Sequence, residues 1–235
     1  MFAFSPGELQ AIGLSLKVAF WAMLGSLPLA LALAWLLART EFPGKTLLDA
    51  AVHLPLVLPP VVVGYVLLIA FGRRGPIGAP LAHDLGIVFA FRWTGAALAS
   101  AVMGLPLMVR AIRQSLDSVD RGLEAAAVTL GANRAWVFLS VTLPLVLPGL
   151  LTGMVLAFAR SLGEFGATIT FVSNIPGETQ TLPLAIYSYT QVPGGEGAAA
   201  RLCLLAIALS FAALVASELL LRRTRVIVLG HADRG

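Results

Sequence analysis

Charged residues are scarce in this chain. Asp, Glu, Lys and Arg make up 12% of its 235 residues, about half of the roughly 25% found in soluble domains. Hydrophobic residues make up 58%, and water does not solvate so much apolar surface. The composition therefore excludes a soluble domain and predicts an all-α membrane protein. The net charge of +4 comes from basic residues scattered between apolar runs, which does not indicate nucleic-acid binding.

Several chemical motifs are also missing. Cys203 is the only cysteine and lies in an apolar run, so the sequence predicts neither a disulfide framework nor a thiol–metal site. No glycine-rich phosphate loop is found, so the chain is not expected to hydrolyse ATP by itself. The sequence also has no HExxH motif and no Gly-x-Ser-x-Gly elbow. We therefore expect no catalytic residue, no metal ligand and no cofactor in this chain.

Five apolar segments are long enough to cross the hydrocarbon core, which requires about 20 residues. We expect the spans at Leu9–Ala38, Leu47–Phe71, Trp93–Val109, Leu145–Ala159 and Leu202–Leu221, within a single domain covering residues 1–235. The second span contains Pro55, Pro59 and Pro60. These prolines predict a kinked helix packed within protein, where neighbours satisfy the freed carbonyls. They are either a structural kink or a hinge that moves during gating.

Lysine and arginine placement predicts that the N-terminus lies outside and the C-terminus inside. Ten of the 16 basic residues then lie on the inner side: Arg39, Lys45, Arg110, Arg113, Arg121, Arg134, Arg222, Arg223, Arg225 and Arg234. The outer side holds Lys17, Arg73, Arg74, Arg92, Arg160 and Arg201. The cluster of three arginines directly after the last span is the strongest anchor for this orientation.

Two connecting segments are expected, an inner one at about 111–144 and an outer one at about 171–200. In the inner segment, apolar residues recur at spacings of three or four and predict a helix on the membrane surface: Leu116, Val119, Leu123, Ala126 and Leu130. In the outer segment, turn residues flank a short expected helix at Leu182–Gln191.

The inner segment contains a compact helix followed by a turn. Glu124, Ala125 and Ala126 begin an alanine-rich stretch, which favours a thin helix. Gly131 supplies the left-handed conformation that ends such a helix, and Leu143-Pro144 begins the next span. This element is either an ordinary amphipathic loop helix or a docking element for a soluble partner.

The same residues resemble the EAA loop of ATP-binding-cassette (ABC) importer permeases. In that family Glu-Ala-Ala precedes a glycine, followed later by an apolar residue, any residue and Leu-Pro. Gly131, Val141 and Leu143-Pro144 match the family spacing, whereas Glu124 lies seven residues before the glycine instead of six. Ala125 thus occupies the usual glutamate position.

Other segments resemble molybdate importer permeases: Phe42–Lys45, His53–Gly64, Phe71–Gly75, Pro106–Arg113 and Ala159–Thr168. The resemblance implies a type I ABC importer permease fold in the inner (plasma) membrane. It further implies a homodimer, two cytoplasmic ATPase subunits that bind ATP and Mg, and a periplasmic binding protein that delivers the oxyanion. Sulfate or thiosulfate permeases share much of this pattern, and tungstate is another possible substrate.

Ionisable groups within membrane spans are expensive and are often functional. Arg160 and Glu164 are one helical turn apart, so they share a face and can pair. They either face the pathway and shape its gate, or orient two helices. Ser161 and Thr168 either line an oxyanion route or form hydrogen bonds between helices.

Two other classes of function compete with an ATP-driven importer. An ion-coupled transporter or channel would need coupling carboxylates at the middle of the membrane or an inverted repeat. Glu164 and Glu218 are too few and too peripheral for that mechanism. An intramembrane enzyme is disfavoured because the catalytic motifs are missing.

Overall fold

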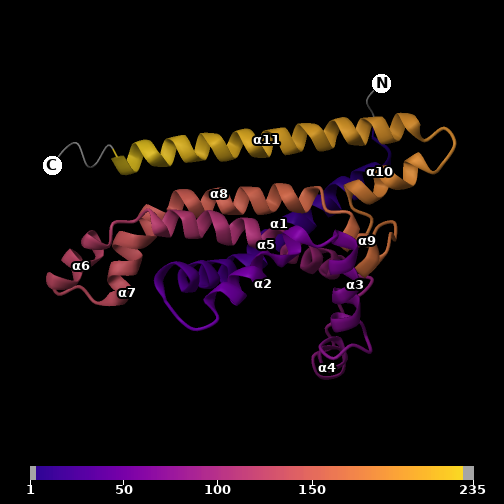
Figure 1. Cartoon of the computed structure of the whole chain (residues 1–235). Coiled ribbons are helices and arrows are strands. Elements are labelled where there is room, and N and C mark those ends of the chain that lie inside the picture. The colour runs from indigo at the N-terminus through magenta and orange to yellow at the C-terminus, as the bar shows by residue number, and fades with distance from the viewer. Residues whose placement is uncertain (1–3, 230–235) are drawn as a thin grey trace.

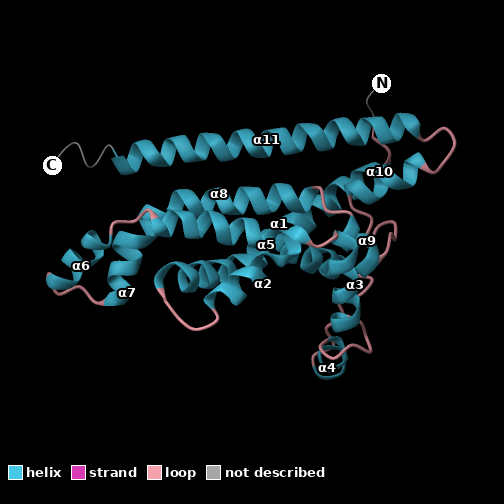
Figure 2. Cartoon of the chain, viewed as in Figure 1, coloured by secondary structure: helices cyan, strands magenta, loops and turns pink. Residues whose placement is uncertain are grey.

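The computed structural model describes residues 4–229, in which every regular element is a helix (Figures 1 and 2). In chain order these are α1 (Pro6–Arg39), α2 (Lys45–Val57), α3 (Pro60–Phe71), α4 (Gly78–Asp84), α5 (Trp93–Asp117), α6 (Arg121–Thr129), α7 (Arg134–Val137), a π-helical turn η1 (Phe138–Thr142), α8 (Leu143–Leu162), α9 (Gly166–Val172), α10 (Leu182–Thr190) and α11 (Glu196–Leu229). The expected all-α fold is confirmed.

Four helical segments of the described chain are long and apolar enough to cross a membrane. They are Pro6–Arg39, Trp93–Asp117, Ala135–Leu162 and Glu196–Ala216, at the positions of the first, third, fourth and fifth expected spans. The first span begins with a capping box, in which the Ser5 side chain accepts from the Glu8 N–H and the Glu8 carboxylate accepts from the Ser5 N–H. Pro28 lies inside this helix without ending it.

The second expected span is broken, so the prediction of one kinked helix is wrong. Helices α2 and α3 meet at an angle of 114° between Val57 and Pro60. Leu58 and Pro59 have extended ψ values of 144° and 131°, because the helical region is disfavoured for a residue before proline and each of the two precedes one. Two consecutive prolines therefore end one helix and start another. Only the two segments counted together amount to a fifth span.

The surface helix is shorter than the apolar periodicity indicated. Residues 111–117 continue α5, and the chain breaks at Ser118 before Asp120 caps α6. Leu116 and Val119 are buried in the core, whereas Leu123 and Leu130 are exposed. The apolar residues that share this spacing are therefore divided between two separate helices, α5 and α6, which have different neighbours.

The body of the protein is formed by α1, α5 and α8, which pack against one another. Glycines bring α5 and α8 into close contact, as small residues do in membrane helix pairs. A Cβ built on Gly149 would lie 2.3 Å from the Cβ of Ser115, and one on Gly153 would lie 3.1 Å from the Met108 carbonyl oxygen. Helix α3 packs on α9, and α11 packs on α8 and α10.

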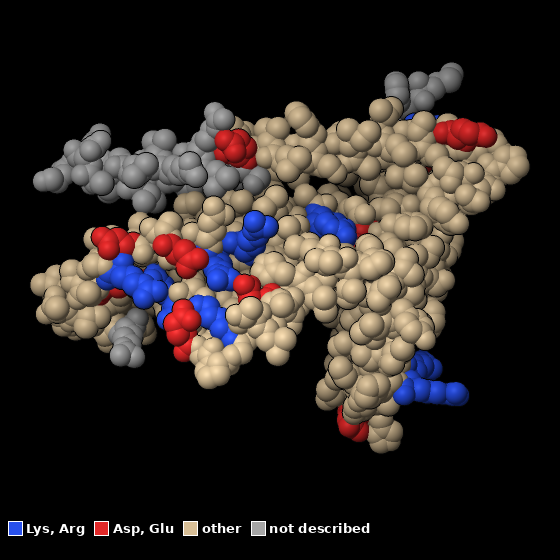
Figure 3. Space-filling view, in the orientation of Figure 1, with Lys and Arg blue, Asp and Glu red and all other residues tan. Residues whose placement is uncertain are grey.

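The two ends of this helical body differ in charge. Helices α6 and α7 and the loop between α1 and α2 lie at one end, here called the α6 end (Figure 1). Helices α9, α10 and α4 lie towards the other end, called the α9 end. Most of the charged side chains visible in Figure 3 gather at the α6 end. Arg234 lies outside the described residues, as do the side chains of Arg134, Arg222, Arg223 and Arg225.

Helix α11 contributes little to the core of this chain. Only 11% of its apolar stretch is buried, compared with 56% for α5. Leu204, Ile207 and Phe211 are each at least 65% exposed. An apolar face of this extent requires lipid or another protein chain as its neighbour. The outer segment contains α10 at Leu182–Thr190, which confirms the short helix expected there.

Candidate functional site

Helix α6 is delimited by local signals at both ends. The Asp120 carboxylate accepts a hydrogen bond of 2.8 Å from the Gly122 N–H at its start. At its end, the Ala132 N–H donates to the Ala127 carbonyl and the Gly131 N–H donates to the Val128 carbonyl. This pair of bonds is a Schellman motif, which requires a left-handed residue. Gly131 has φ +91°, which confirms the predicted role of this glycine in ending the helix.

The tip of the α6–α7 loop is apolar and exposed. Leu130 is 88% exposed, and Val128, Trp136 and Leu139 are also exposed. Ala125 and Ala126 of α6 are exposed as well. An open hollow of about 440 Å³ is lined by Ala127, Leu130, Gly131, Ala132, Asn133 and Trp136. We call residues 125–139 the loop tip. A surface of this kind, at the charged end of a membrane protein, has the character of a protein-docking site.

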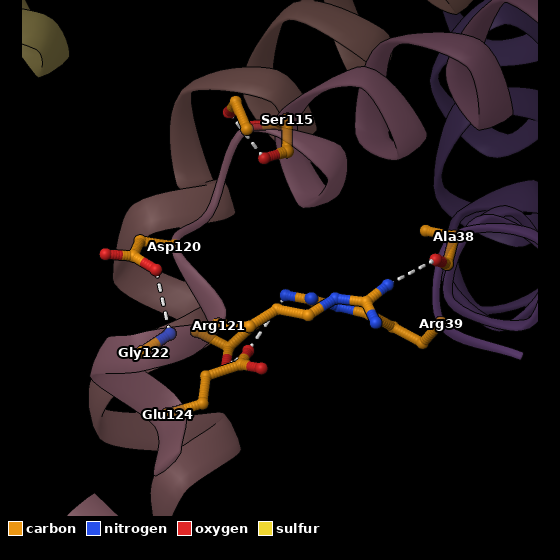
Figure 4. Close-up of polar contacts among 9 residues, drawn as sticks. Ala38, Arg39, Ser115, Asp120, Arg121, Gly122 and Glu124 are labelled. Carbon is orange, nitrogen blue, oxygen red and sulfur yellow. Dashed lines mark hydrogen bonds and ion pairs between the residues drawn. The ribbon is translucent and has the colours of Figure 1, made fainter. Parts of the chain in front are cut away.

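Glu124 does not belong to this exposed tip. Its Oε1 atom accepts hydrogen bonds from Arg39 Nη2 at 2.9 Å and from Thr142 Oγ1 at 2.7 Å (Figure 4 shows the Arg39 contact). The Glu124 side chain is 22% exposed and that of Arg39 is 10% exposed. The structure thus turns the one acidic side chain of α6 towards the body of the protein.

Leu143 and Pro144 begin α8 as expected, but no break separates them from the preceding helices. The Leu143 N–H donates to the Phe138 carbonyl and closes the π-helical turn η1. Pro144 has no N–H to donate and lies in the first turn of α8, directly after the π-helical turn, so it removes one backbone hydrogen bond without ending the helix. The loop tip is therefore joined to α8 by a continuous helical path from Ala135 to Leu162.

Arg160, Ser161, Glu164 and Thr168 lie around the short break between α8 and α9. Arg160 Nη1 is 2.6 Å from Glu164 Oε2, and the Glu164 side chain is 1% exposed. Glu164 Oε1 accepts from the Ala167 N–H at 2.8 Å, in the first turn of α9. The expected Arg160–Glu164 pair is present, and the glutamate also caps a helix.

The two hydroxyls near this break have different surroundings. Ser161 Oγ donates to the carbonyl of Ala157 in its own helix at 2.8 Å. Thr168 Oγ1 is buried and has no hydrogen-bond partner within residues 4–229. Neither forms the expected side-chain hydrogen bond between helices in the described chain. A buried hydroxyl without a partner is unfavourable.

The proline run lies directly against this break. A Cβ built on Gly166 would lie 2.8 Å from the Cβ of Pro60 and 3.3 Å from the Val61 nitrogen. A Cβ on Gly64 would lie 2.5 Å from the Ala167 carbonyl oxygen. The structure thus brings the predicted hinge at Pro59-Pro60 together with the Glu164–Thr168 segment, which the sequence alone did not indicate.

Helix α2, on the other side of the prolines, is held to α5 by a separate ion pair. Arg113 Nη1 of α5 is 3.0 Å from Asp49 Oδ2 of α2. His53 Nδ1 is 3.2 Å from Asp49 Oδ1. The two halves of the broken span are thus anchored to different helices, α2 to α5 and α3 to α9. Pro55 lies inside α2 and does not end it.

Three residues of the site were missed as site residues. Arg39 is the last residue of α1, Arg121 Nη2 donates to the Ala38 carbonyl at 3.5 Å, and Thr142 is the last residue of η1. For Arg39, the available signal was its position at a helix C-terminus, where a basic residue also complements the helix dipole. No group of three or more His, Cys, Asp or Glu side chains able to hold a metal ion is found in the described chain.

These features define a multi-span α-helical membrane protein with an exposed apolar loop at its charged end. The chain belongs to the family of binding-protein-dependent transport system inner membrane components, whose model matches residues 26–226. It is therefore an inner-membrane component of a transport system.

Individual relatives and a solved structure agree with this family. The chain is 63% identical over 218 residues to the molybdenum transport system permease protein ModB of Escherichia coli (strain K12), covering 93% of this chain and 95% of the relative. It is 62% identical over 216 residues to ModB of Haemophilus influenzae, covering 92% and 94% of the two chains. The structure matches a bacterial ABC transporter involved in alginate import with a TM-score of 0.68 and 18% identity, covering 95% of this chain and 81% of that chain. The last comparison confirms the importer-permease fold.

Proposed function

We propose that this chain is the membrane-spanning subunit of an ATP-driven importer of molybdate. Two observations support the substrate class. The chain shares 63% identity with a molybdenum transport permease over nearly its full length, and its motifs resemble those of molybdate importer permeases. The exposed apolar loop tip supports the ATP-driven mechanism, because a chain with no phosphate loop can use ATP only through another polypeptide that docks on it.

The loop tip at residues 125–139 is the proposed docking site of the ATPase. The hollow of about 440 Å³ beside Gly131 is lined mainly by apolar and small residues and accepts a protruding side chain of a partner. Glu124, Ala125, Ala126, Gly131, Leu143 and Pro144 form the coupling segment in this proposal. ATP and Mg are bound by the partner, and the orientation with the N-terminus outside and the C-terminus inside places this loop in the cytoplasm.

The complex is proposed to contain two copies of this chain, two ATPases and an external binding protein. The break between α2 and α3 supports the second copy. Backbone groups at a break in a membrane helix must be covered by protein or face water, yet Val57, Val61 and Tyr65 are exposed in the single chain. A partner copy over this face would cover the break and place it beside a shared pathway.

The pathway in this proposal passes the break between α8 and α9. Arg160 is the positively charged member of its pair with Glu164. Its side chain is 28% exposed, so it can face a passing oxyanion. Binding of ATP draws the two loop tips together and opens the pathway to the binding protein. Hydrolysis of ATP returns the spans and releases the anion inside.

Reconstitution tests this proposal directly. The permease, its ATPase and its binding protein are placed in liposomes, and uptake of labelled molybdate is measured with ATP inside. Uptake should require all three proteins and ATP, and should persist with an equal concentration of sulfate. Uptake driven by an ion gradient without the ATPase would contradict the proposal, and equal competition by sulfate would favour a sulfate importer. Tungstate in the same assay defines the breadth of the site.

A further inference from the structure

We propose that Arg39, Glu124 and Thr142 form a clasp that carries movement of α6 to the ends of two membrane spans. Glu124 thereby acts within the permease as a positioning residue, and it does not serve as a contact to the ATPase. This inference rests on the proposed function, since it concerns how force from the docked ATPase reaches the spans.

The clasp joins three elements at one oxygen atom. Glu124 Oε1 lies 2.9 Å from Arg39 Nη2, at the end of α1, and 2.7 Å from Thr142 Oγ1, directly before α8. Thr142 is 1% exposed. Among the described residues, Glu124 is the only carboxylate within ion-pair distance of Arg39. A charge-assisted bond shielded in this way is roughly twice as strong as a bond between neutral groups.

Helix α6 has few other means of transmitting a load. None of its residues is buried, so no packed core connects it to the membrane helices. Its other polar tie is the Arg121 side chain, which donates to the Ala38 carbonyl at the same end of α1 (Figure 4). The polar contacts at Ala38 and Arg39 are thus the lateral connection between α6 and α1. The clasp adds a connection to α8 through Thr142.

The end of α1 is itself firmly held at this point. The Trp35 and Phe138 rings pack edge to face with centroids 5.2 Å apart, which joins α1 to η1. The Arg39 guanidinium lies 5.7 Å from the centroid of the Trp35 ring. Because α1 and η1 are already packed together here, a displacement of Glu124 should move both elements, and not only the Arg39 side chain.

The clasp also explains the position of the glutamate in the sequence. Glu124 lies one residue earlier than the usual family spacing, which rotates its side chain by about 100° around the helix. Ala125 takes the usual position and is exposed. The rotation moves the carboxylate from the face available to a partner to the face that meets Arg39. A one-residue shift therefore changes the contact from external to internal.

The test compares single variants, a charge exchange and a matched control in the reconstituted complex. Glu124→Gln and Arg39→Met each remove the ion pair, and Arg39→Glu combined with Glu124→Arg reverses it. Glu41→Gln is the control, because Glu41 pairs with Lys45 at 2.7 Å on the same side of the protein but is 88% exposed. The hydrogen bond from Lys45 lowers the pKa of Glu41, so this control also removes a full negative charge at neutral pH.

Each single variant should still co-purify with the ATPase, while ATP-dependent uptake falls about 5- to 100-fold, the usual range of coupling between sites. The exchanged pair should recover at least part of the uptake lost by either single variant. Glu41→Gln should transport at the parent rate. Failure of the parent protein to bind any ATPase would refute the proposed function itself, independently of the clasp.

Two results would overturn the clasp. One is loss of ATPase binding in Glu124→Gln with normal binding in Arg39→Met, which would make Glu124 an external contact. The other is parent-level uptake in both single variants. If the single variants do not accumulate in the membrane, the exchanged pair decides: assembly with uptake above background supports the clasp, and assembly without uptake overturns it.

Discussion

The loop containing α6 and the break between α8 and α9, at opposite ends of the helical body, differ in how much of them is buried. None of the α6 residues is buried, and the helix is held by polar contacts to Arg39, Thr142 and Ala38. At the other break, Glu164 is 1% exposed, and α3 and α9 meet at Gly64 and Gly166 with no room for a side chain. The first arrangement suits a docking helix that a partner protein binds, and the second suits a closely packed gate.

Loss of the buried carboxylate at the α9 end should have the largest effect. Glu164→Ala leaves Arg160 without its partner and removes the acceptor for the Ala167 N–H. Breaking a buried ion pair in this way costs about 3 kcal/mol. The thermal unfolding midpoint of the detergent-solubilised protein should fall clearly, and little protein should accumulate in membranes. Glu164→Gln, which retains the shape and the bond from Ala167, should be affected less; an unchanged midpoint in Glu164→Ala would refute the packed-gate interpretation.

Adding one methyl group to a glycine tests the contrast between the two ends. In Gly64→Ala the new Cβ would lie 2.5 Å from the Ala167 carbonyl oxygen, and overpacking of this kind costs about 1–3 kcal/mol. Gly131→Ala meets nothing within 4 Å, and only the left-handed backbone is disfavoured, by about 1–2 kcal/mol. Unfolding of the membrane body should respond to Gly64→Ala and scarcely to Gly131→Ala. Uptake should respond to both, and a larger loss of unfolding stability in Gly131→Ala would reverse the comparison.

A charge at the loop tip should affect assembly without affecting the membrane body. Leu130 is 88% exposed, so Leu130→Asp should not destabilise the permease. It should weaken ATPase binding about tenfold, which corresponds to about 1.4 kcal/mol. Co-purification at increasing ATPase concentration measures this effect. The matched control is Leu85→Asp, at an exposed leucine beyond α4, which should bind the ATPase normally; equal weakening by both would mean that the effect is not local.

Among the buried positions, the smallest effect on stability is expected at Thr168. Its hydroxyl is buried without a partner in the described chain, so Thr168→Val should keep the free energy of unfolding within about 1 kcal/mol of the parent. If the hydroxyl contributes to the anion route, the apparent affinity for molybdate should fall while stability does not. A marked loss of stability would instead indicate a structural hydrogen bond from a second copy of the chain.

The sequence predicted the spans well because long apolar runs depend only on the thickness of the bilayer. It placed α1, α5, α8 and α11, and it anticipated the turn at Gly131, whose conformation depends on local backbone bonds. The break at Leu58–Pro60 was underestimated, because the angle between two helices depends on packing partners such as Gly166. The internal position of Glu124 was missed for the same reason: its partners Arg39 and Thr142 are distant in sequence, and no local pattern reports them.

Site-directed cross-linking tests the central claim most directly. Cys203 is the only cysteine of the chain, so Cys203→Ser gives a background in which Leu130→Cys provides one reactive thiol at the loop tip. This thiol should cross-link to the ATPase subunit in inside-out membranes and should resist a membrane-impermeant thiol reagent applied to intact cells. Labelling from the outside of intact cells, or no cross-link to any nucleotide-hydrolysing subunit, would contradict the assignment of this loop as the docking site of the ATPase.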